Sequence, residues 1–195
     1  MMGKTHMAFG AAFYSVAVPP STGSFNELFT WGTGLAVTIV ASISADIDDP
    51  RNTAGKMIMP IVPRWLRPTA FAVVGALGIW YGYQTGNMLL MMIGFGFFAA
   101  AIMRHRNSPT HSPVGMILIS LPIYIFLPAY ILPVLIGYGS HLIGDAITEG
   151  IPYAWPLPGW LCIPLMKTGG FLDMVVVRYG SIGTVMYQLA TNLQI

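Results

Sequence analysis

The chain has 195 residues, of which 55% are hydrophobic and only 8% charged, and its formal net charge is +2. About a quarter of the residues of a soluble domain are charged, so this chain cannot cover itself with polar surface and is predicted to be an integral membrane protein. The small net charge, without a basic stripe, excludes a typical nucleic-acid-binding protein. The single cysteine, Cys162, excludes an internal disulfide and a metal cage built from thiolates.

Seven apolar stretches follow one another along the chain. They cover residues 5–18, 25–45, 69–83, 87–103, 114–127, 129–146 and, less cleanly, 171–189. A helix needs ~20 residues to cross a bilayer core, and several stretches are shorter, which leaves room for tilted or incomplete helices. We therefore expect an all-α fold, a polytopic transmembrane helical bundle of six or seven helices, some of them short. The short connections favour a single domain over residues 1–195, and whether the last stretch spans the membrane is left open.

The first stretch has a second interpretation. Lys4 followed by the apolar run 7–18 also resembles the charged and hydrophobic regions of a signal peptide. We favour a helix of the bundle, because His6 at the start of this stretch belongs to the pattern of histidines described below.

The positions of lysine and arginine predict an orientation. They lie at the N-terminus or in every second connection, including the two long polar ones, 46–67 and 149–170. The alternate connections contain none, and only Arg178 departs from the pattern. Because cytoplasmic loops hold the excess of positive charge, the N-terminus and the long loops are predicted to face the cytoplasm.

The histidines and most acidic residues occur at ends of the predicted helices that share one side of the membrane. In chain order these residues are His6, Asp46, Asp48, Asp49, His105, His111, His141, Asp145 and Asp173. An ionisable group near the bilayer centre costs about 2.5–3.5 kcal/mol, so such groups tend to be paired, hydrated or bound to metal. We expect several of these groups to share one pocket at the cytoplasmic end of the bundle.

Two of these residues have the spacing of metal ligands. His141 and Asp145 are four residues apart, which places them one helical turn apart, about 6 Å along the axis. Imidazole and carboxylate ligands suit zinc, manganese or iron better than calcium. The sequence therefore predicts a divalent metal, with zinc favoured, and leaves open whether one ion or two are bound.

Each of these features also has a simpler structural explanation. His141 and Asp145 could form an ion pair on a helix surface, and the acidic run 46–49 could end a helix in a solvated turn. Arg104 and Arg106 could anchor the chain at the membrane surface, and Thr110 could cap a helix. The presence of all four histidines on one side favours a site over these alternatives.

An ordered set of sequence blocks resembles the YdjM-type inner-membrane metal-dependent hydrolase family. The blocks are Thr5-His6, the run 45–50 (ADIDDP), residues 105–112, the run 140–148 (SHLIGDAIT), and its continuation through 150–152 and 155–157. The resemblance implies that a metal-dependent hydrolytic site is lined by His6, Asp46, Asp48, His105, His111, His141 and Asp145. Two positions and one spacing depart from the pattern. Asp49 replaces a usual histidine, Asp173 replaces a glutamate, and the spacing of His105 from His111 is one residue longer, which puts the role of His105 in question.

These observations predict hydrolysis of a lipid ester or phosphoester at the cytoplasmic leaflet. A bound metal would activate water, Asp49 would accept its proton, Arg104 or Arg106 would hold a phosphate, and Thr110 would orient the substrate. The alternatives are a divalent-metal transporter and a non-catalytic metal-binding or structural membrane protein. No Gly-x-Ser-x-Gly elbow and no phosphate loop are present, so a serine hydrolase and a nucleotide-binding protein are not expected. Membrane lipids are the expected partners, and the oligomeric state is left open.

Overall fold

The computed structural model describes residues 1–21, 23–49, 52–102 and 109–192, with the side chain of Asp48 outside this description. Over these ranges the chain is helical and contains no β-strand, only an isolated antiparallel bridge between Ile151 and Leu161. The all-α prediction is therefore confirmed. Among the described residues, none of the helices has the combination of length and hydropathy that a membrane crossing requires.

Each of the seven predicted apolar stretches forms a helix, the last one included. These helices are α1 (Gly3–Ala17), α2 (Phe25–Ala41), α4 (Arg67–Thr85), α5 (Met88–Ile102), α6 (Pro113–Phe126), α7 (Ile131–Ala146) and α8 (Arg178–Asn192). Shorter elements lie in the connections: α3 (Thr53–Ile58), the 3₁₀ helices η1 (Ser44–Asp48), η2 (Pro109–His111) and η3 (Pro128–Tyr130), and the π-helix η4 (Leu172–Val177).

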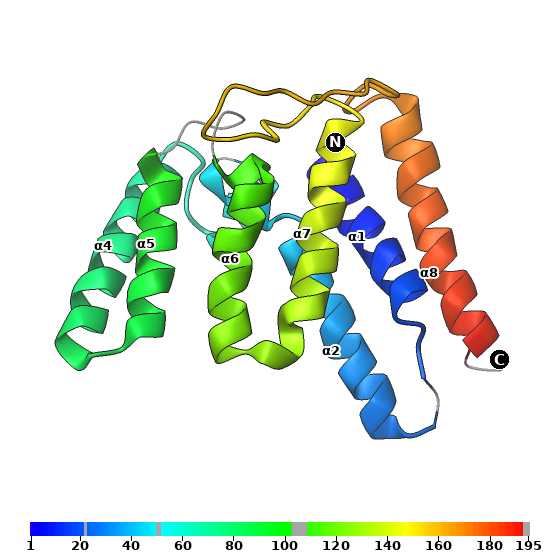
Figure 1. Ribbon diagram of the computed structural model, residues 1–195, viewed down its shortest axis with the longest axis horizontal. Helices are drawn as coiled ribbons and strands as arrows, with labels where there is room; N and C mark the ends of the chain where they lie inside the picture. Colours follow the sequence, from blue (N-terminus) through cyan, green and yellow to red (C-terminus); the bar gives the residue numbers. More distant parts are fainter. Residues whose placement is uncertain (22, 50–51, 103–108, 193–195) are drawn as a thin grey trace.

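The helices lie side by side, with α7 near the centre of the array (Figure 1). α1 packs against α2, α7 and α8, whereas α4 and α5 pack mainly against each other as a hairpin at one side. Tyr138 and Leu142 of α7 form the buried core together with Ala45, Ala146 and Ile151. The core therefore lies around the C-terminal half of α7.

Local hydrogen bonds determine where the second predicted helix stops. The hydroxyl of Ser42 donates to the carbonyl of Ile39 at 2.7 Å, and that of Ser44 donates to the carbonyl of Ala41 at 2.7 Å. Serine side chains that bond nearby carbonyls compete with the helical backbone pattern. α2 ends at Ala41 rather than near residue 45, and the chain continues as η1, which carries Asp46.

Capping side chains begin two elements next to the polar residues. Asn52 accepts hydrogen bonds from the backbone N–H groups of Ala54 and Gly55, so the connection 46–67 contains the short helix α3, which the sequence pattern did not predict. Ser112 accepts from the N–H of Gly115 and begins α6 directly after η2. The alternative role considered for Thr110, a helix cap, is thus filled by Ser112 at the start of α6.

Candidate metal centre

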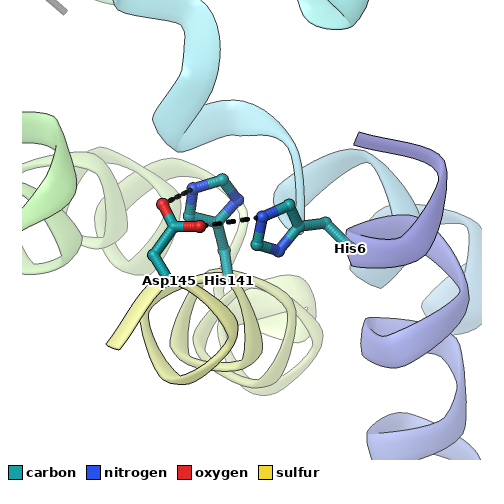
Figure 2. Close-up of side chains that lie close together, drawn as sticks. All are labelled: His6, His141 and Asp145. Atoms are coloured by element: carbon teal, nitrogen blue, oxygen red, sulfur yellow. Dashed lines mark hydrogen bonds and ion pairs between the residues drawn. The ribbon is translucent and has the colours of Figure 1, made fainter. Parts of the chain in front are cut away.

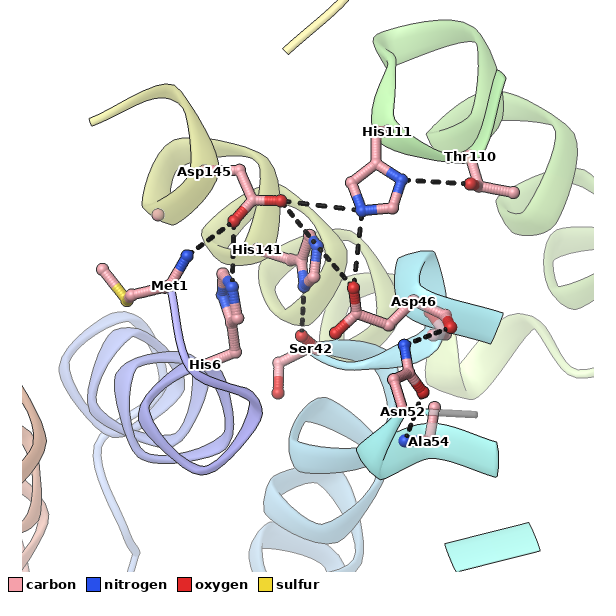
Figure 3. A network of polar contacts seen from close by, with 12 residues as sticks. Met1, His6, Ser42, Asp46, Asn52, Ala54, Thr110, His111, His141 and Asp145 are labelled. Carbon is pink, nitrogen blue, oxygen red and sulfur yellow. Dashed lines mark hydrogen bonds and ion pairs between the residues drawn. The ribbon is translucent and has the colours of Figure 1, made fainter. Parts of the chain in front are cut away.

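Five of the predicted residues meet at one end of the array, the upper end in Figure 1 (Figure 3). They come from four elements: His6 from the first turns of α1, Asp46 from η1, His111 from η2, and His141 and Asp145 from α7. His6, His111 and His141 are almost completely buried, which in an apolar protein requires partners for their ring nitrogens.

Asp145 is at the centre of this cluster. Its Oδ2 lies 3.2 Å from Nε2 of His141 and 3.6 Å from Nε2 of His111. Its Oδ1 lies 3.0 Å from Nε2 of His6 and 3.0 Å from the amino nitrogen of Met1. The rings of His6 and His141 stack with their centroids 4.0 Å apart (Figure 2). The two oxygens of one carboxylate therefore face different sets of nitrogens.

Asp46 completes a second set of facing atoms. Its Oδ1 lies 3.4 Å from Nε2 of His111 and 3.9 Å from Nε2 of His141. Two groups of potential ligand atoms result, His6–His141–Asp145 and Asp46–His111–His141, which have His141 in common. For metal–ligand bonds of about 2.0–2.1 Å, neighbouring ligand atoms of a tetrahedral site are separated by roughly 3.3 Å. The observed separations of 3.2–3.9 Å around His111 and His141 are close to this value, so these groups could hold a metal ion.

The main chain orients the ring of His141 for metal binding. Its Nδ1 lies 2.8 Å from the carbonyl oxygen of Ser42, which can only accept, so Nδ1 carries the proton and donates. Nε2 then presents a lone pair, and this buried atom has no hydrogen-bond partner among the residues that the structure describes. A backbone carbonyl behind the opposite ring nitrogen is the usual arrangement of a metal-bound histidine.

The other two histidines differ in this respect. Nδ1 of His111 lies 3.3 Å from the hydroxyl of Thr110, whose carbonyl in turn accepts a hydrogen bond from the Tyr138 hydroxyl. Nδ1 of His6, by contrast, is buried and has no hydrogen-bond partner within the described part of the chain. The geometry thus supports His111 and His141 as ligands more fully than His6, whose Nε2 is placed to donate to Asp145.

The neighbouring imidazoles affect the ionisation of Asp46. Burial alone would raise the pKa of the Asp46 carboxyl, but a hydrogen bond with His111 and favourable electrostatic interactions with the neighbouring imidazoles outweigh it and hold the pKa below its usual value. Asp46 is therefore a carboxylate at neutral pH, the form that binds a cation.

Comparison with known proteins assigns the family. The family model described as "YdjM inner membrane protein" matches residues 1–193. The chain belongs to this family. Membership confirms the resemblance seen in the sequence blocks and indicates the inner membrane as the location of the protein. No curated protein and no solved structure matches the chain.

A small cavity of about 90 Å³ opens beside the cluster of this YdjM-family protein. Asp46, His111 and Asp145 line it, together with Glu149 and Thr168. A water molecule takes about 30 Å³ in the liquid, so the cavity has room for an ion and a few waters, not for a whole lipid. Only the reacting bond of a large substrate would fit beside these residues, with the rest of the molecule outside the cavity.

Several predicted residues are placed elsewhere or not described. Thr110, predicted to orient a substrate, has its hydroxyl beside His111, and Asp49 is half-buried at the end of η1 and not among the described residues that line the cavity. His105, Arg104 and Arg106 lie outside the described residues, as does the side chain of Asp48. Their predicted roles stay predictions.

Asp173 of η4 is buried and belongs to neither group of potential metal ligands. It lies next to the start of α1. Its Oδ2 accepts hydrogen bonds from the N–H of Gly169 at 2.7 Å and of Met2 at 3.0 Å. Asp173 therefore helps to hold the first turn of α1, which carries His6, in place.

Sequence reasoning missed two contributors to the site. Glu149 lines the cavity, and its position four residues after Asp145, itself four after His141, is a spacing that could have revealed it. Ser42 acts through its backbone carbonyl, which every residue possesses, so no sequence signal identifies it.

Proposed function

We propose that this YdjM-family protein is a membrane-embedded, metal-dependent hydrolase that acts on an ester or phosphoester bond of a lipid at the cytoplasmic leaflet. The observation that carries the proposal is the convergence of three imidazoles and two carboxylates whose facing atoms are 3.0–3.9 Å apart. Such a set of buried ionisable groups is costly without a cation to bind.

The residues that would hold the ion are Asp46, His111, His141 and Asp145. Two imidazole nitrogens with two carboxylate oxygens suit zinc, and manganese or iron next. Because Nδ1 of His141 is occupied by the Ser42 carbonyl, its one free lone pair can bind only one ion at a time. A second ion, if bound, would have to reach the cluster through Oδ1 of Asp145 and His6.

A bound divalent ion would polarise the oxygen of the scissile bond and make water more acidic, which is the chemistry that the side chains alone lack. The carboxylate of Glu149 lines the same cavity and is our first candidate to accept the proton of the attacking water, with Asp49 as the alternative. Arg104 or Arg106 would bind a phosphate through paired N–H donors. The narrow cavity limits access by bulk water and favours a substrate held partly in the membrane.

The apolar surface supports a membrane setting. Leu77 of α4, Phe95 of α5 and Ile117 of α6 are 56–61% exposed, and they are three of many large hydrophobic side chains on the outside of the array. Soluble monomers rarely expose apolar surface of this extent, whereas lipid tails would cover it. The polar cluster lies at one end of the array, the level at which lipid headgroups would meet it.

A lipid-hydrolysis assay combined with metal analysis tests the proposal. Purified wild-type protein should contain about one divalent ion per chain and release product from phospholipid vesicles. His111→Ala and Asp145→Ala should lose the ion and at least a hundredfold in turnover. Glu27→Ala, which changes an exposed acid at the start of α2, is the control and should match wild type.

Equal turnover in wild type and all three variants would overturn the proposal of a metal-dependent hydrolase. A wild-type protein without bound metal would instead support a hydrogen-bonded network between helices. Metal flux into proteoliposomes that is lost in Asp145→Ala would support the transporter. We rank transport lower because the candidate ligands lie at helix ends, whereas transporter sites usually lie at midplane helix breaks.

A further inference from the structure

An apolar groove of about 780 Å³ runs along the side of α1. α2 and α8 contribute its walls, and α3 lies across one end. Ala8 and Ala11 of α1 leave room at its floor, while Ile182 and Met186 of α8 are 45% and 61% exposed along its edge. Its volume is within the range of about 300–1,000 Å³ that is typical of ligand pockets.

The groove and the candidate metal centre use opposite faces of α1. Lys4, Ala8 and Ala11 recur at intervals of four and three residues, so they share one face of the helix. His6 is two residues from both Lys4 and Ala8, which at 3.6 residues per turn places it about 200° around the helix. A ligand in the groove would therefore not occupy the cavity beside Asp145.

Two lysines lie at one end of the groove. Lys4 is in the first turn of α1 and Lys56 is in α3. The two helices pack closely at Gly3, where an added Cβ would lie only 2.8 Å from the hydroxyl oxygen of Thr53. Within the described part of the chain, neither ammonium group is in an ion pair, and no Asp or Glu lines the groove. The groove thus combines uncompensated positive charge at one end with apolar walls.

We propose that this groove binds one anionic phospholipid, with its phosphate between Lys4 and Lys56 and an acyl chain along α1, α2 and α8. Charge complementarity selects the occupant, since an uncharged chain or a zwitterionic lipid would leave the two ammonium groups unbalanced. From Lys4 to Ala11 the groove follows α1 for about 10 Å, enough for a substantial part of an acyl chain. The site is independent of the proposed hydrolase and needs no metal.

Lipid retention by the purified full chain in a neutral detergent tests this site. The delipidated protein is titrated with phosphatidylglycerol or phosphatidylcholine of identical acyl chains, and bound lipid is counted by native mass spectrometry. Chelator is present throughout, so loss of metal chemistry cannot affect the result. Wild type should bind one phosphatidylglycerol in preference to phosphatidylcholine, and K4Q/K56Q should weaken phosphatidylglycerol binding roughly thirtyfold. K167Q, which removes one positive charge from an exposed position outside the groove, is the control and should bind like wild type.

A second pair of variants tests the apolar part of the groove. Ala8→Phe fills the floor and should weaken both lipids, whereas Ala190→Phe, at an exposed position near the end of α8, should have no effect. Equal binding of both lipids by wild type, or unchanged phosphatidylglycerol binding in K4Q/K56Q, would overturn the proposal. A dimer that dissociates in Ala8→Phe while lipid binding stays unchanged would assign the groove to a second copy of the chain and would also overturn it.

Discussion

The two sides of the array are stabilised in opposite ways. Between α1 and α7 the most deeply buried side chains are polar, among them His6, Ser140 and His141, each at most 1% exposed. Between α4 and α5 the two backbones approach each other closely at glycines. A Cβ on Gly75 would lie 2.5 Å from the backbone nitrogen of Phe98, and one on Gly94 would lie 2.6 Å from that of Ile79.

This difference indicates that α4 and α5 serve mainly the packing of the protein, whereas α1 and α7 carry the candidate metal site. Small residues that bring two helices close together are a general means of stabilising helix pairs in membranes and require no ligand. Buried imidazoles and carboxylates are destabilising unless they are paired or bound to an ion, so a cluster of them indicates a functional site. Substitutions in α4–α5 should therefore alter stability with the metal site intact, and those at α7 should alter metal binding first.

The largest effect is expected at His141, which belongs to both groups of potential ligands. His141→Gln removes the oriented Nε2 lone pair and should lower metal affinity by more than a hundredfold, since loss of a supporting residue alone costs about 10–100-fold. Competition with a metal-binding dye, together with metal analysis after dialysis, measures the change. A variant that keeps wild-type affinity would remove His141 from the site.

A smaller effect, on stability alone, is expected in the hairpin. Gly94→Leu must push α4 and α5 apart and should cost about 1–3 kcal/mol, seen as a lower melting temperature in detergent. Gly96→Leu is the matched control on the same helix, because a Cβ there meets no atom within 4 Å. Both variants should bind metal with the stoichiometry of wild type. Loss of metal in Gly94→Leu at a temperature where it is folded would contradict the separation drawn above.

The smallest effect is expected at His6. Because its Nδ1 has no hydrogen-bond partner within the described residues and its Nε2 faces Oδ1 of Asp145, we assign it as a donor to Asp145 rather than a ligand. His6→Gln keeps an N–H donor and should reduce metal affinity by less than about tenfold, below the range for loss of a supporting residue. The same dye competition, run beside His141→Gln, decides the matter. Equal losses in the two variants would make His6 a ligand.

Much of the arrangement followed from hydrophobic patterning. Apolar runs separated by turn residues predicted six or seven long helices, of which the structure has seven. Threading them in alternating directions predicted that His6, Asp46, His111 and Asp145 would meet at one end. That reasoning needs only chain connectivity and helix length. It did not predict where α2 stops, because two serine hydroxyls decide this, nor α3, which depends on the cap from Asn52.

The sequence by itself determined the helical class, the order of the helices and the meeting of His6, Asp46, His111, His141 and Asp145 at one end, because these depend on periodicity and length along the chain. Only the tertiary structure decided which nitrogen of His141 faces the cluster, that Glu149 lines the cavity, and that Lys4 and Lys56 lie at the end of one groove. These facts depend on backbone carbonyls and on contacts between helices far apart in sequence. Such contacts are set by three-dimensional packing, about which the order of residues along one helix carries little information.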